Sequence, residues 1–419
     1  MKNLPFLVLI FVSCKRPQQP DTLVSKATSN QEIVREQTNS HIQMKKPYVV
    51  IISLDGFRYD YAEKYNATHL LNFKVKAEKM IPSFPSKTFP NHYAIATGLY
   101  PGNNGLVSNE FYDRSLNSEY SPENRKAVEN ASFYNGTPLW VLASEQNMVT
   151  ASMFWVGSET PIKGVTPTYS YKYNGKISYN DRVNQVVQWL KLPEEKRPHL
   201  ITLYFSITDD IGHKFGPNSE EIKQAVKEID ETIGDLSEKI NKLNLPVNII
   251  VVSDHGMLEV NTDDLIYPEK LFPSKFKVTR SFPAMIYSDD SIAIDSLYQS
   301  LVKDTTQYSV YYKNNLPVRF HYNSNDDRVG DLVVMPKPPF SFGRLNSTVN
   351  EGASTHGYDP AVTPQMGAIF YATGPAFKKA TIPAFENVNV YPLVAQILGL
   401  EYNKKAIDGN IEVLEPILK

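Results

Sequence analysis

The chain has 419 residues, and its 43 Lys and Arg against 45 Asp and Glu give a formal net charge of −2. This near balance excludes a nucleic-acid-binding surface built on bulk positive charge, and we expect no binding to a nucleic-acid duplex. Hydrophobic residues make up 42% and charged residues 21%, as in globular proteins rather than disordered or membrane-spanning ones. The length predicts two domains, or one large α/β domain with an inserted subdomain.

The N-terminus has the features of an export signal. Met1 and Lys2 form a short positive start, an apolar run covers residues 4–12, and Cys14 follows as the single cysteine of the chain. The run is shorter than the roughly 20 residues that a membrane-spanning helix needs. We therefore expect residues 1–13 to be a signal peptide that is removed after export. One cysteine also excludes an intrachain disulfide and a thiolate metal cluster.

Residues 11–14 resemble a bacterial lipobox, although Phe11 stands where Leu is usual. The resemblance implies that Cys14 becomes a lipidated N-terminus and anchors a periplasmic or outer-membrane lipoprotein in the bacterial cell envelope. The alternative is a plain signal peptide with an incidental cysteine. Residues 15–44 are rich in Gln, Ser, Thr, Asn and charged residues and show no sustained apolar periodicity, so we expect 14–44 to form a lipidated, flexible tether. The catalytic domain should then cover residues 45–419.

The rest of the chain alternates between strand-like and helix-like patterns. Apolar runs of strand length occur at residues 48–53, 149–156, 200–206, 247–253 and 367–372, and helical patterns occur at 180–190, 219–243 and 390–400. This alternation predicts an α/β fold with a mostly parallel sheet covered by helices on both faces. Residues 261–350 break the rhythm with shorter strand-like pieces at 308–312, 318–322 and 332–335, and we expect a smaller inserted subdomain there.

Acidic and histidine side chains follow three of the predicted strands, and His356 lies in a loop just before the predicted strand at 367–372. The six residues in question are Asp55, Asp209, His213, Asp254, His255 and His356. Each alone is more simply explained as part of a turn, but a parallel sheet brings its strand ends to one edge. Carboxylates and imidazoles without thiolates suit Zn²⁺, and also Mn²⁺ or Fe. The number of ligands exceeds what one tetrahedral zinc needs, so we expect two metal ions.

A candidate nucleophile lies in the loop after the first strand. Residues 82–98 predict a Pro-stiffened loop that enters a short helix, with Pro90 in its first turn and Gly98 at its end. Thr88 then lies at the helix N-terminus, where the helix dipole favours an alkoxide and an incoming phosphate. From the local sequence alone, an ordinary N-cap is the simpler explanation of Thr88.

Several ordered motifs closely resemble the nucleotide pyrophosphatase/phosphodiesterase family of the alkaline phosphatase superfamily. They are Phe84-Pro-Ser-Lys-Thr88-Phe-Pro-Asn-His-Tyr, Asp55-Gly-Phe-Arg, Asn109-Glu-Phe-Tyr-Asp, Asp209-Asp-Ile-Gly-His213, Asp254-His255-Gly-Met and His356-Gly-Tyr-Asp, and the match extends along most of residues 48–400. The resemblance implies an alkaline-phosphatase-like fold and two zinc ions per chain. It assigns one ion to Asp209, His213 and His356, and the other to Asp55, Asp254 and His255, with Thr88 reaching a metal through its oxygen.

The resemblance also implies the reaction. Thr88 would attack phosphorus to give a covalent phosphothreonine, Asn109 would donate to a phosphoryl oxygen, and Phe89 and Tyr204 would sandwich a base or another flat group. We therefore expect a zinc-dependent hydrolase that cleaves phosphodiester or pyrophosphate bonds of nucleotides or related small molecules. The alternatives are a phospholipid head-group or phosphonate hydrolase of the same superfamily, or a lipoprotein that binds ligands without catalysis.

Overall fold

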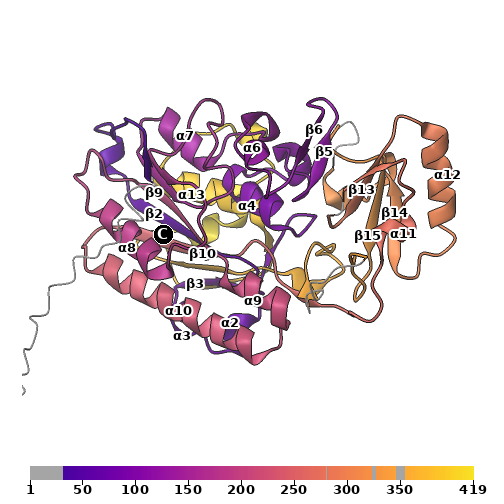
Figure 1. Ribbon diagram of the computed structural model, residues 1–419. Coiled ribbons are helices and arrows are strands. Elements are labelled where there is room, and N and C mark those ends of the chain that lie inside the picture. The colour runs from indigo at the N-terminus through magenta and orange to yellow at the C-terminus, as the bar shows by residue number, and fades with distance from the viewer. Residues whose placement is uncertain (1–31, 280, 323–326, 346–353) are drawn as a thin grey trace, which may run out of the picture.

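The computed structural model describes residues 32–279, 281–322, 327–345 and 354–419, so the predicted signal peptide and Cys14 lie outside the described residues. Within these ranges, nine strands form the central sheet (Figure 1). Their order is β1 (Glu32–Val34), β8 (Tyr169–Tyr171), β7 (Thr150–Met153), β9 (Leu200–Phe205), β2 (Tyr48–Leu54), β10 (Val247–Val252), β17 (Phe370–Thr373), β3 (Val75–Ala77) and β18 (Ala380–Ile382). The strands from β8 to β10 run parallel, whereas β1, at the edge, is antiparallel to β8, and β17 is antiparallel to both β10 and β3. The predicted mostly parallel sheet is confirmed.

Strand β2 is apolar throughout because both of its faces are covered. Val49 and Ile51 belong to one core, with side chains of α4 (Thr88–Thr97), α7 (Leu139–Glu145) and α13 (Val390–Leu398). Val50 and Ile52 point the other way, into a core shared with α2 (Tyr61–Lys64), α3 (Thr68–Leu71), α8 (Tyr179–Leu190) and α10 (Glu220–Asn241). Figure 1 shows these two helical layers on either side of the sheet. None of the helices in the described part of the chain has the length and apolar character needed to cross a bilayer.

Residues of the expected inserted segment form a second body beside the main sheet, drawn in orange in Figure 1. Its described strands form a sheet in the order β12 (Lys277–Val278), β13 (Ala284–Tyr287), β15 (Leu332–Pro336) and β14 (Tyr308–Tyr312). Helix α12 (Ser291–Leu301) covers this sheet, and Ile286, Leu297 and Val334 are among the residues of its separate core. The short helix α11 (Pro268–Leu271) belongs to the same body.

The strand expected at residues 318–322 is wrong. Val318–Phe320 is a 3-10 helix, and His321 after it adopts a left-handed backbone conformation with φ 52°. Val318 points into solvent, whereas Phe320 is buried and stacks on Phe84 with a centroid separation of 3.7 Å. Phe320 is the one buried side chain of this turn, and it packs on Phe84. In so short a segment, an exposed residue and a buried one two positions apart look like the alternation of a strand.

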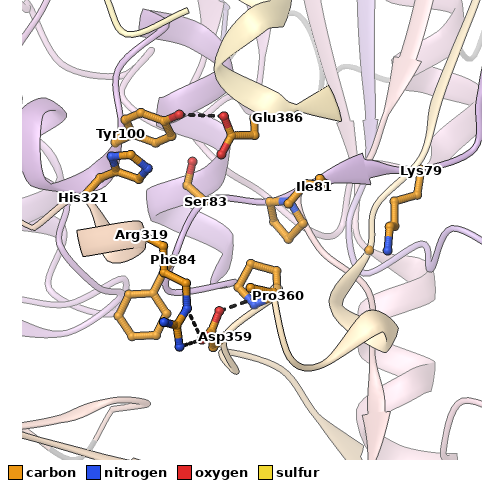
Figure 2. A pocket seen from close by; sticks show the side chains of 13 residues that line it. Lys79, Ile81, Ser83, Phe84, Tyr100, Arg319, His321, Asp359, Pro360 and Glu386 are labelled. Atoms are coloured by element: carbon orange, nitrogen blue, oxygen red, sulfur yellow. Dashed lines mark hydrogen bonds and ion pairs between the residues drawn. The ribbon is translucent and has the colours of Figure 1, made fainter. Parts of the chain in front are cut away.

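This turn attaches the second body to the main one (Figure 2). The Arg319 Nε and Nη2 both donate to Asp359 Oδ2, at 2.9 and 2.7 Å. The His321 ring lies flat on Tyr100 at 3.7 Å, and the Tyr100 hydroxyl donates to Glu386 at 2.7 Å. These side chains line a cavity of about 320 Å³. The two bodies therefore meet through an ion pair and an aromatic stack as well as through the buried Phe320.

The expectation of a flexible tether up to residue 44 is wrong for its last part. Strand β1 pairs with β8, and Asn39 is buried next to the start of β7. The Asn39 amide donates to the carbonyls of Glu194 and Arg197 at 2.9 and 2.8 Å, and its oxygen accepts from the Val149 N–H at 2.7 Å. Asn39 shows that a polar side chain in this segment can bind backbone groups of the fold. Composition alone does not tell such a side chain from one that is bound to water.

Replacing Asn39 with alanine should therefore destabilise the fold. Three backbone groups would lose their partner, and the Val149 N–H among them is buried. An unsatisfied buried group costs about 1–3 kcal/mol. Urea unfolding of Asn39→Ala, with Ile42→Ala as a control on a side chain exposed to solvent, measures the difference. Equal unfolding midpoints for the two variants would show that residues 32–44 contribute nothing to stability.

Candidate active site

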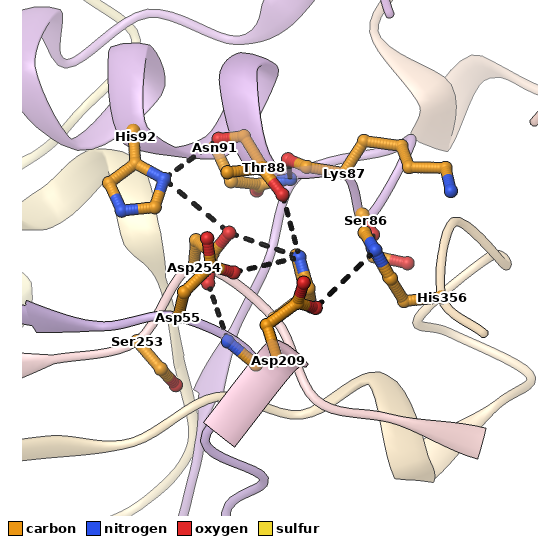
Figure 3. A network of polar contacts seen from close by, with 12 residues as sticks. Asp55, Ser86, Lys87, Thr88, Asn91, His92, Asp209, Ser253, Asp254 and His356 are labelled. Carbon is orange, nitrogen blue, oxygen red and sulfur yellow. Dashed lines mark hydrogen bonds and ion pairs between the residues drawn. The ribbon is translucent and has the colours of Figure 1, made fainter. Parts of the chain in front are cut away.

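The predicted ligands meet at the carboxyl edge of the sheet (Figure 3). Asp55 follows β2 and Asp254 follows β10, and these strands pair in parallel register with Ser53 opposite Val252. Asp209 lies in the first turn of α9 (Ile207–Phe215), which begins directly after β9. His356 follows the short strand β16 (Ser354–Thr355), which pairs with β11 (Leu258–Glu259). Asp55, Asp209 and Asp254 thus converge because β2, β9 and β10 share one edge of the central sheet, and His356 joins them from the separate two-stranded sheet of β11 and β16.

The ligand atoms form two overlapping groups of three. One group is Asp55, Asp254 and His255, and the other is Asp209, His255 and His356, with the ligand atoms of each group within 4.8 Å of one another. The His255 Nε2 lies 3.0 Å from Asp254 Oδ2 and 3.5 Å from Asp55 Oδ1. The His356 Nε2 lies 3.7 Å from Asp209 Oδ1, and its ring stacks on that of His255 at 3.5 Å.

His213 lies at the margin of this cluster. Its Nε2 is 3.4 Å from Asp209 Oδ1, one helical turn away on α9, and its ring centroid is 5.0 Å from that of His356. The tight group around Asp209 and His356 contains His255 rather than His213. All six predicted ligands are therefore close together, while the way in which they divide between two ions stays a prediction.

The three imidazoles all turn the same nitrogen toward the carboxylates. In His213, His255 and His356 the Nδ1 donates to a backbone carbonyl at 2.9 Å, supplied by Ser354, Gly256 and Ser86 respectively. A carbonyl oxygen only accepts, so the proton sits on Nδ1 and the Nε2 lone pair faces the cluster. This arrangement of a carbonyl behind each ring is typical of histidines that bind metal.

The carboxylates fit a cation as well. Asp55 Oδ1, Asp209 Oδ1 and Asp254 Oδ2 are buried and accept no hydrogen bond from the described residues. Burial, followed by the neighbouring carboxylates of Asp254 and Asp209, raises the pKa of Asp55 well above its ordinary value. Buried anionic oxygens without donors are costly unless a positive charge compensates them. The oxygen and nitrogen donors and the absence of thiolates suit a divalent ion such as Zn²⁺.

A glycine permits the carboxylates to approach one another. Gly56 has φ 66°, and a Cβ at this position would lie 2.9 Å from the Asp209 Cα. Its N–H donates to Asp254 Oδ1 at 3.1 Å, which leaves the other oxygen of that carboxylate directed at the cluster. A side chain at position 56 would therefore push α9 away from the strand ends.

Thr88 is not the N-cap of α4, and its hydroxyl faces the ligand cluster. Lys87, in an extended conformation, occupies the N-cap of α4, and Thr88 is the first helical residue. The Thr88 Oγ1 lies 3.3 Å from the His255 Nε2 (Figure 3). Helix α4 ends at Gly98, with φ 69°, as the sequence predicts. The capping explanation of Thr88 is thus excluded, because the hydroxyl points at the ligand cluster.

The loop before Thr88 is held by a single asparagine. Asn91 accepts from the Ser83 N–H at 2.7 Å and donates to the carbonyls of Pro85 and Lys87, at 2.9 and 2.8 Å. A side chain on the first turn of α4 therefore binds both ends of the loop that precedes it. This fixes the direction from which the chain enters the helix.

Asn109 contacts the backbone next to Thr88 and keeps its amide NH₂ available for donation. Its Oδ1 accepts from the Phe89 N–H at 2.9 Å, so its NH₂ group remains as a donor. Asn109 and Lys87 line a pocket of about 210 Å³ whose other walls include Phe282 of the second body. Burial lowers the pKa of Lys87 to about 8. The predicted role of Asn109 toward a phosphoryl oxygen is compatible with this geometry and stays a prediction.

The two predicted aromatic residues differ in what they contact. Phe89 is half-buried and meets the edge of Tyr120 at 6.1 Å. The Tyr204 hydroxyl donates to Asp55 Oδ2, and burial, followed by the Asp55 charge, raises the pKa of that hydroxyl well above its ordinary value. Tyr204 thus orients a ligand, a contact that the sequence analysis did not anticipate. The exposed ring nearby is Tyr173, whose centroid lies 6.2 Å from that of Tyr204.

Two residues near the cluster were missed by the sequence analysis. Tyr173 lies outside every motif that was recognised, so no local signal marks it. His92 lies within the motif that contains Thr88, but the sequence analysis assigned no role to it. It is fully buried, and its Nδ1 lies 3.4 Å from Asp254 Oδ2. Both were detectable only after the helix and strand ends had been placed in space.

The Tyr204 contact predicts an effect on metal affinity. Tyr204→Phe keeps the ring and removes the donor to Asp55, and loss of such an outer contact typically weakens metal binding by about 10- to 100-fold. Titration of the apoprotein with Zn²⁺ in a metal buffer measures this, with Tyr173→Phe as the control. Equal affinities in both variants would contradict the orienting role of the hydroxyl.

Comparison with known proteins agrees with this site. The family profile described as type I phosphodiesterase / nucleotide pyrophosphatase matches residues 49–359. Venom phosphodiesterase 2 of Crotalus adamanteus is 36% identical over 373 residues, which are 84% of this chain and 45% of that protein. An uncharacterized pyrophosphatase/phosphodiesterase of Schizosaccharomyces pombe is 34% identical over 390 residues, or 88% and 80% of the two chains. The chain therefore spans about half the length of the venom relative and most of the yeast one.

Solved structures show the same fold. Murine ectonucleotide pyrophosphatase/phosphodiesterase 5 superposes with a TM-score of 0.82 at 29% identity, over 89% of this chain and 100% of that chain. An inactive variant of the same murine protein, with alanine in place of a threonine, was solved in complex with AMP and superposes with a TM-score of 0.83. The α/β fold, the metal-ligand cluster and the profile match agree, and the chain belongs to the type I phosphodiesterase / nucleotide pyrophosphatase family.

Proposed function

We propose that this protein is a zinc-dependent hydrolase that cleaves phosphodiester or pyrophosphate bonds of nucleotides through a covalent phosphothreonine. The observation that carries the proposal is the Thr88 hydroxyl at the start of α4, 3.3 Å from His255 and next to carboxylate oxygens without donors. The complex of AMP with the murine relative supports a nucleotide as substrate. The inactivity of its threonine-to-alanine variant supports a threonine nucleophile.

Two zinc ions would be held by the six clustered residues. Asp209, His213 and His356 would bind one ion, and the other would be bound by Asp55, Asp254 and His255, with the Thr88 oxygen beside it. Such ions lower the pKa of a bound hydroxyl and neutralise charge on the attacking and leaving oxygens of an in-line displacement. Because His255 belongs to both groups of three, its replacement would affect both ions.

The residues of the chain account for the remaining steps. The Thr88 Oγ forms a bond to phosphorus as the bond from phosphorus to the leaving oxygen breaks, and the leaving group departs with that electron pair and takes up the proton that Thr88 has lost. The oxygen of a water molecule then bonds to phosphorus, the bond from phosphorus to Thr88 Oγ breaks, one proton of the water restores the hydroxyl, and the phosphate monoester is released. The Asn109 amide would donate to the non-bridging oxygen as its charge develops, beside the positive end of the α4 dipole.

The surroundings of Thr88 favour a phosphodiester with a flat substituent. A diester carries one non-bridging charge and needs fewer donors than a monoester does. The Phe89 ring adjoins the nucleophile, and Tyr204, with the exposed Tyr173 beside it, faces the Asp55 side of the cluster. We propose that Phe89 and Tyr204 flank the base of a nucleotide, with Tyr173 extending the same aromatic wall.

The nucleophile hypothesis predicts a specific loss. Thr88→Ala should fold and bind metal but lose several orders of magnitude in turnover, because no other hydroxyl can form the covalent intermediate. Thr88→Ser should keep part of the activity. The measurement is turnover of an aryl nucleotide diester by the metal-loaded variants, with melting temperatures recorded for each.

Near-wild-type turnover by Thr88→Ala would overturn the covalent mechanism. A panel of aryl nucleotides, dinucleotides and choline phosphodiesters tests the substrate class at the same time. Preference for the choline esters would favour the phospholipid head-group alternative, and binding without turnover of any member would favour a ligand-binding lipoprotein.

The two-zinc hypothesis predicts the metal content. Elemental analysis of the purified protein should find close to two equivalents of zinc, and chelation should abolish turnover. His213→Ala and His255→Ala should both lower the content, the second more severely, since His255 belongs to both groups of ligands. One equivalent in a fully active wild type would contradict the two-metal site.

We propose further that Cys14 anchors the protein to the bacterial cell envelope, on the strength of the short apolar run that precedes it. Expression in a bacterium with labelled fatty acid should give a labelled protein that partitions into detergent, and Cys14→Ala should abolish both. A soluble, unlabelled wild type would contradict the anchor.

A further inference from the structure

His92 is a buried histidine in contact with the site that the reaction scheme does not use. It lies on α4, one helical turn after Thr88, and its ring is enclosed by the edges of Trp155 and Tyr204 at 5.2 and 5.3 Å. Its backbone carbonyl accepts from the Trp155 Nε1 at 3.0 Å. Because the ring is fully buried, it touches neither solvent nor substrate, and any effect on the reaction must pass through its neighbours.

The two ring nitrogens of His92 have different partners. Nδ1 lies 2.8 Å from the Thr88 carbonyl oxygen and 3.4 Å from Asp254 Oδ2, and Nε2 lies 2.8 Å from the Ser53 Oγ. Both oxygens on the Nδ1 side are acceptors, so Nδ1 carries the proton. Ser53 Oγ can both donate and accept, so it donates to Nε2. This tautomer gives both ring nitrogens a hydrogen-bond partner.

These contacts join three parts of the site. Ser53 is on β2, two residues before the ligand Asp55, and Asp254 follows β10, whereas Thr88 begins the helix that carries the nucleophile. The His92 ring therefore sets the distance between the Thr88 backbone and the ends of β2 and β10. Thr88 Oγ1 is only two bonds from the Cα, so a shift of the backbone also shifts this oxygen relative to His255.

We propose that His92, as the neutral Nδ1–H tautomer, is a positioning residue that holds Thr88 over the metal-ligand cluster. The inference rests on the proposed function, since it concerns the nucleophile of that reaction. Misplacing a reacting group by about 1 Å can cost about 10²-fold in rate. Loss of the Nδ1 donor should therefore lower kcat while leaving KM nearly unchanged, because His92 does not touch the substrate.

Three substitutions of His92 distinguish the contribution of the Nδ1 hydrogen bond from that of the Nε2 hydrogen bond. His92→Asn places an amide NH₂ where Nδ1 lies and keeps a donor to Thr88, whereas His92→Gln places its amide near Nε2 and keeps only a partner for Ser53. His92→Phe keeps the ring and removes both. We expect kcat to fall about 10²-fold in His92→Phe and His92→Gln and to recover largely in His92→Asn. Zinc content should remain that of the wild type in all three.

His199 supplies a matched control. It is also fully buried, and its Nδ1 also donates to a backbone carbonyl, that of Pro47 at 3.1 Å, but it lies at the opposite, amino end of β9. His199→Phe should lower the melting temperature without changing kcat. A general loss of packing would affect both phenylalanine variants alike, so a fall in kcat confined to His92→Phe identifies positioning.

The experiment combines steady-state kinetics on an aryl nucleotide diester with ¹⁵N NMR of the imidazoles. The inference is supported by an Nδ1–H signal for His92 and by rescue in His92→Asn. It is overturned if His92→Phe keeps the wild-type kcat, if asparagine rescues no better than glutamine, or if the proton resides on Nε2. A wild type that hydrolyses no diester refutes the proposed function and the inference with it, whereas an active wild type with an unaffected His92→Phe refutes the inference alone.

Discussion

Electrostatic repulsion among three buried carboxylates is the constraint on which the rest of this structure depends. Asp55, Asp209 and Asp254 each have an oxygen without a donor among the described residues, at the end of a sheet whose interior is apolar. Burial leaves little solvent to screen this repulsion, so either a bound cation or a proton has to compensate the charge. The backbone carbonyls behind the histidines, Gly56 and the Tyr204 hydroxyl all serve to present ligands in one direction. The same uncompensated charge makes the site suitable for holding metal next to a hydroxyl.

Much of this arrangement follows from the sequence because it depends on strand order in a parallel sheet. The buried strands were recognisable from continuous apolar runs, and the polar residues after them could lie only at the carboxyl edge. The exact contacts were less predictable. His255, rather than His213, completes the tight group around Asp209, since that depends on the stacking of two rings from separate loops. The Tyr204 hydroxyl donates to Asp55, one of the predicted metal ligands. Alternation along β9 predicts the side of the sheet on which the ring lies but not the partner of its hydroxyl.

The errors at the periphery have a common physical origin. Residues 32–44 have the composition of a solvated linker, yet Asn39 uses all of its amide atoms on backbone groups of the fold. Residues 318–322 imitate a strand, yet Phe320 serves as a single anchor in a 3-10 turn. In both segments a few long-range contacts determine the conformation. Local propensity is weak over such short runs, so tertiary contacts override it.

The stack of Phe320 on Phe84 bears on how far this chain can be divided into parts. Phe84 belongs to the loop that leads into Thr88, so one wall of that loop is supplied by the second body, from more than 200 positions later in the chain. The segment between residues 261 and 350 is thus not an independent module. Excising it, or exchanging it for the corresponding segment of a relative, would remove a contact on which the approach to the nucleophile rests. Variation that alters substrate preference is therefore easier to accommodate along the outer surface of this body than in the turn that carries Phe320.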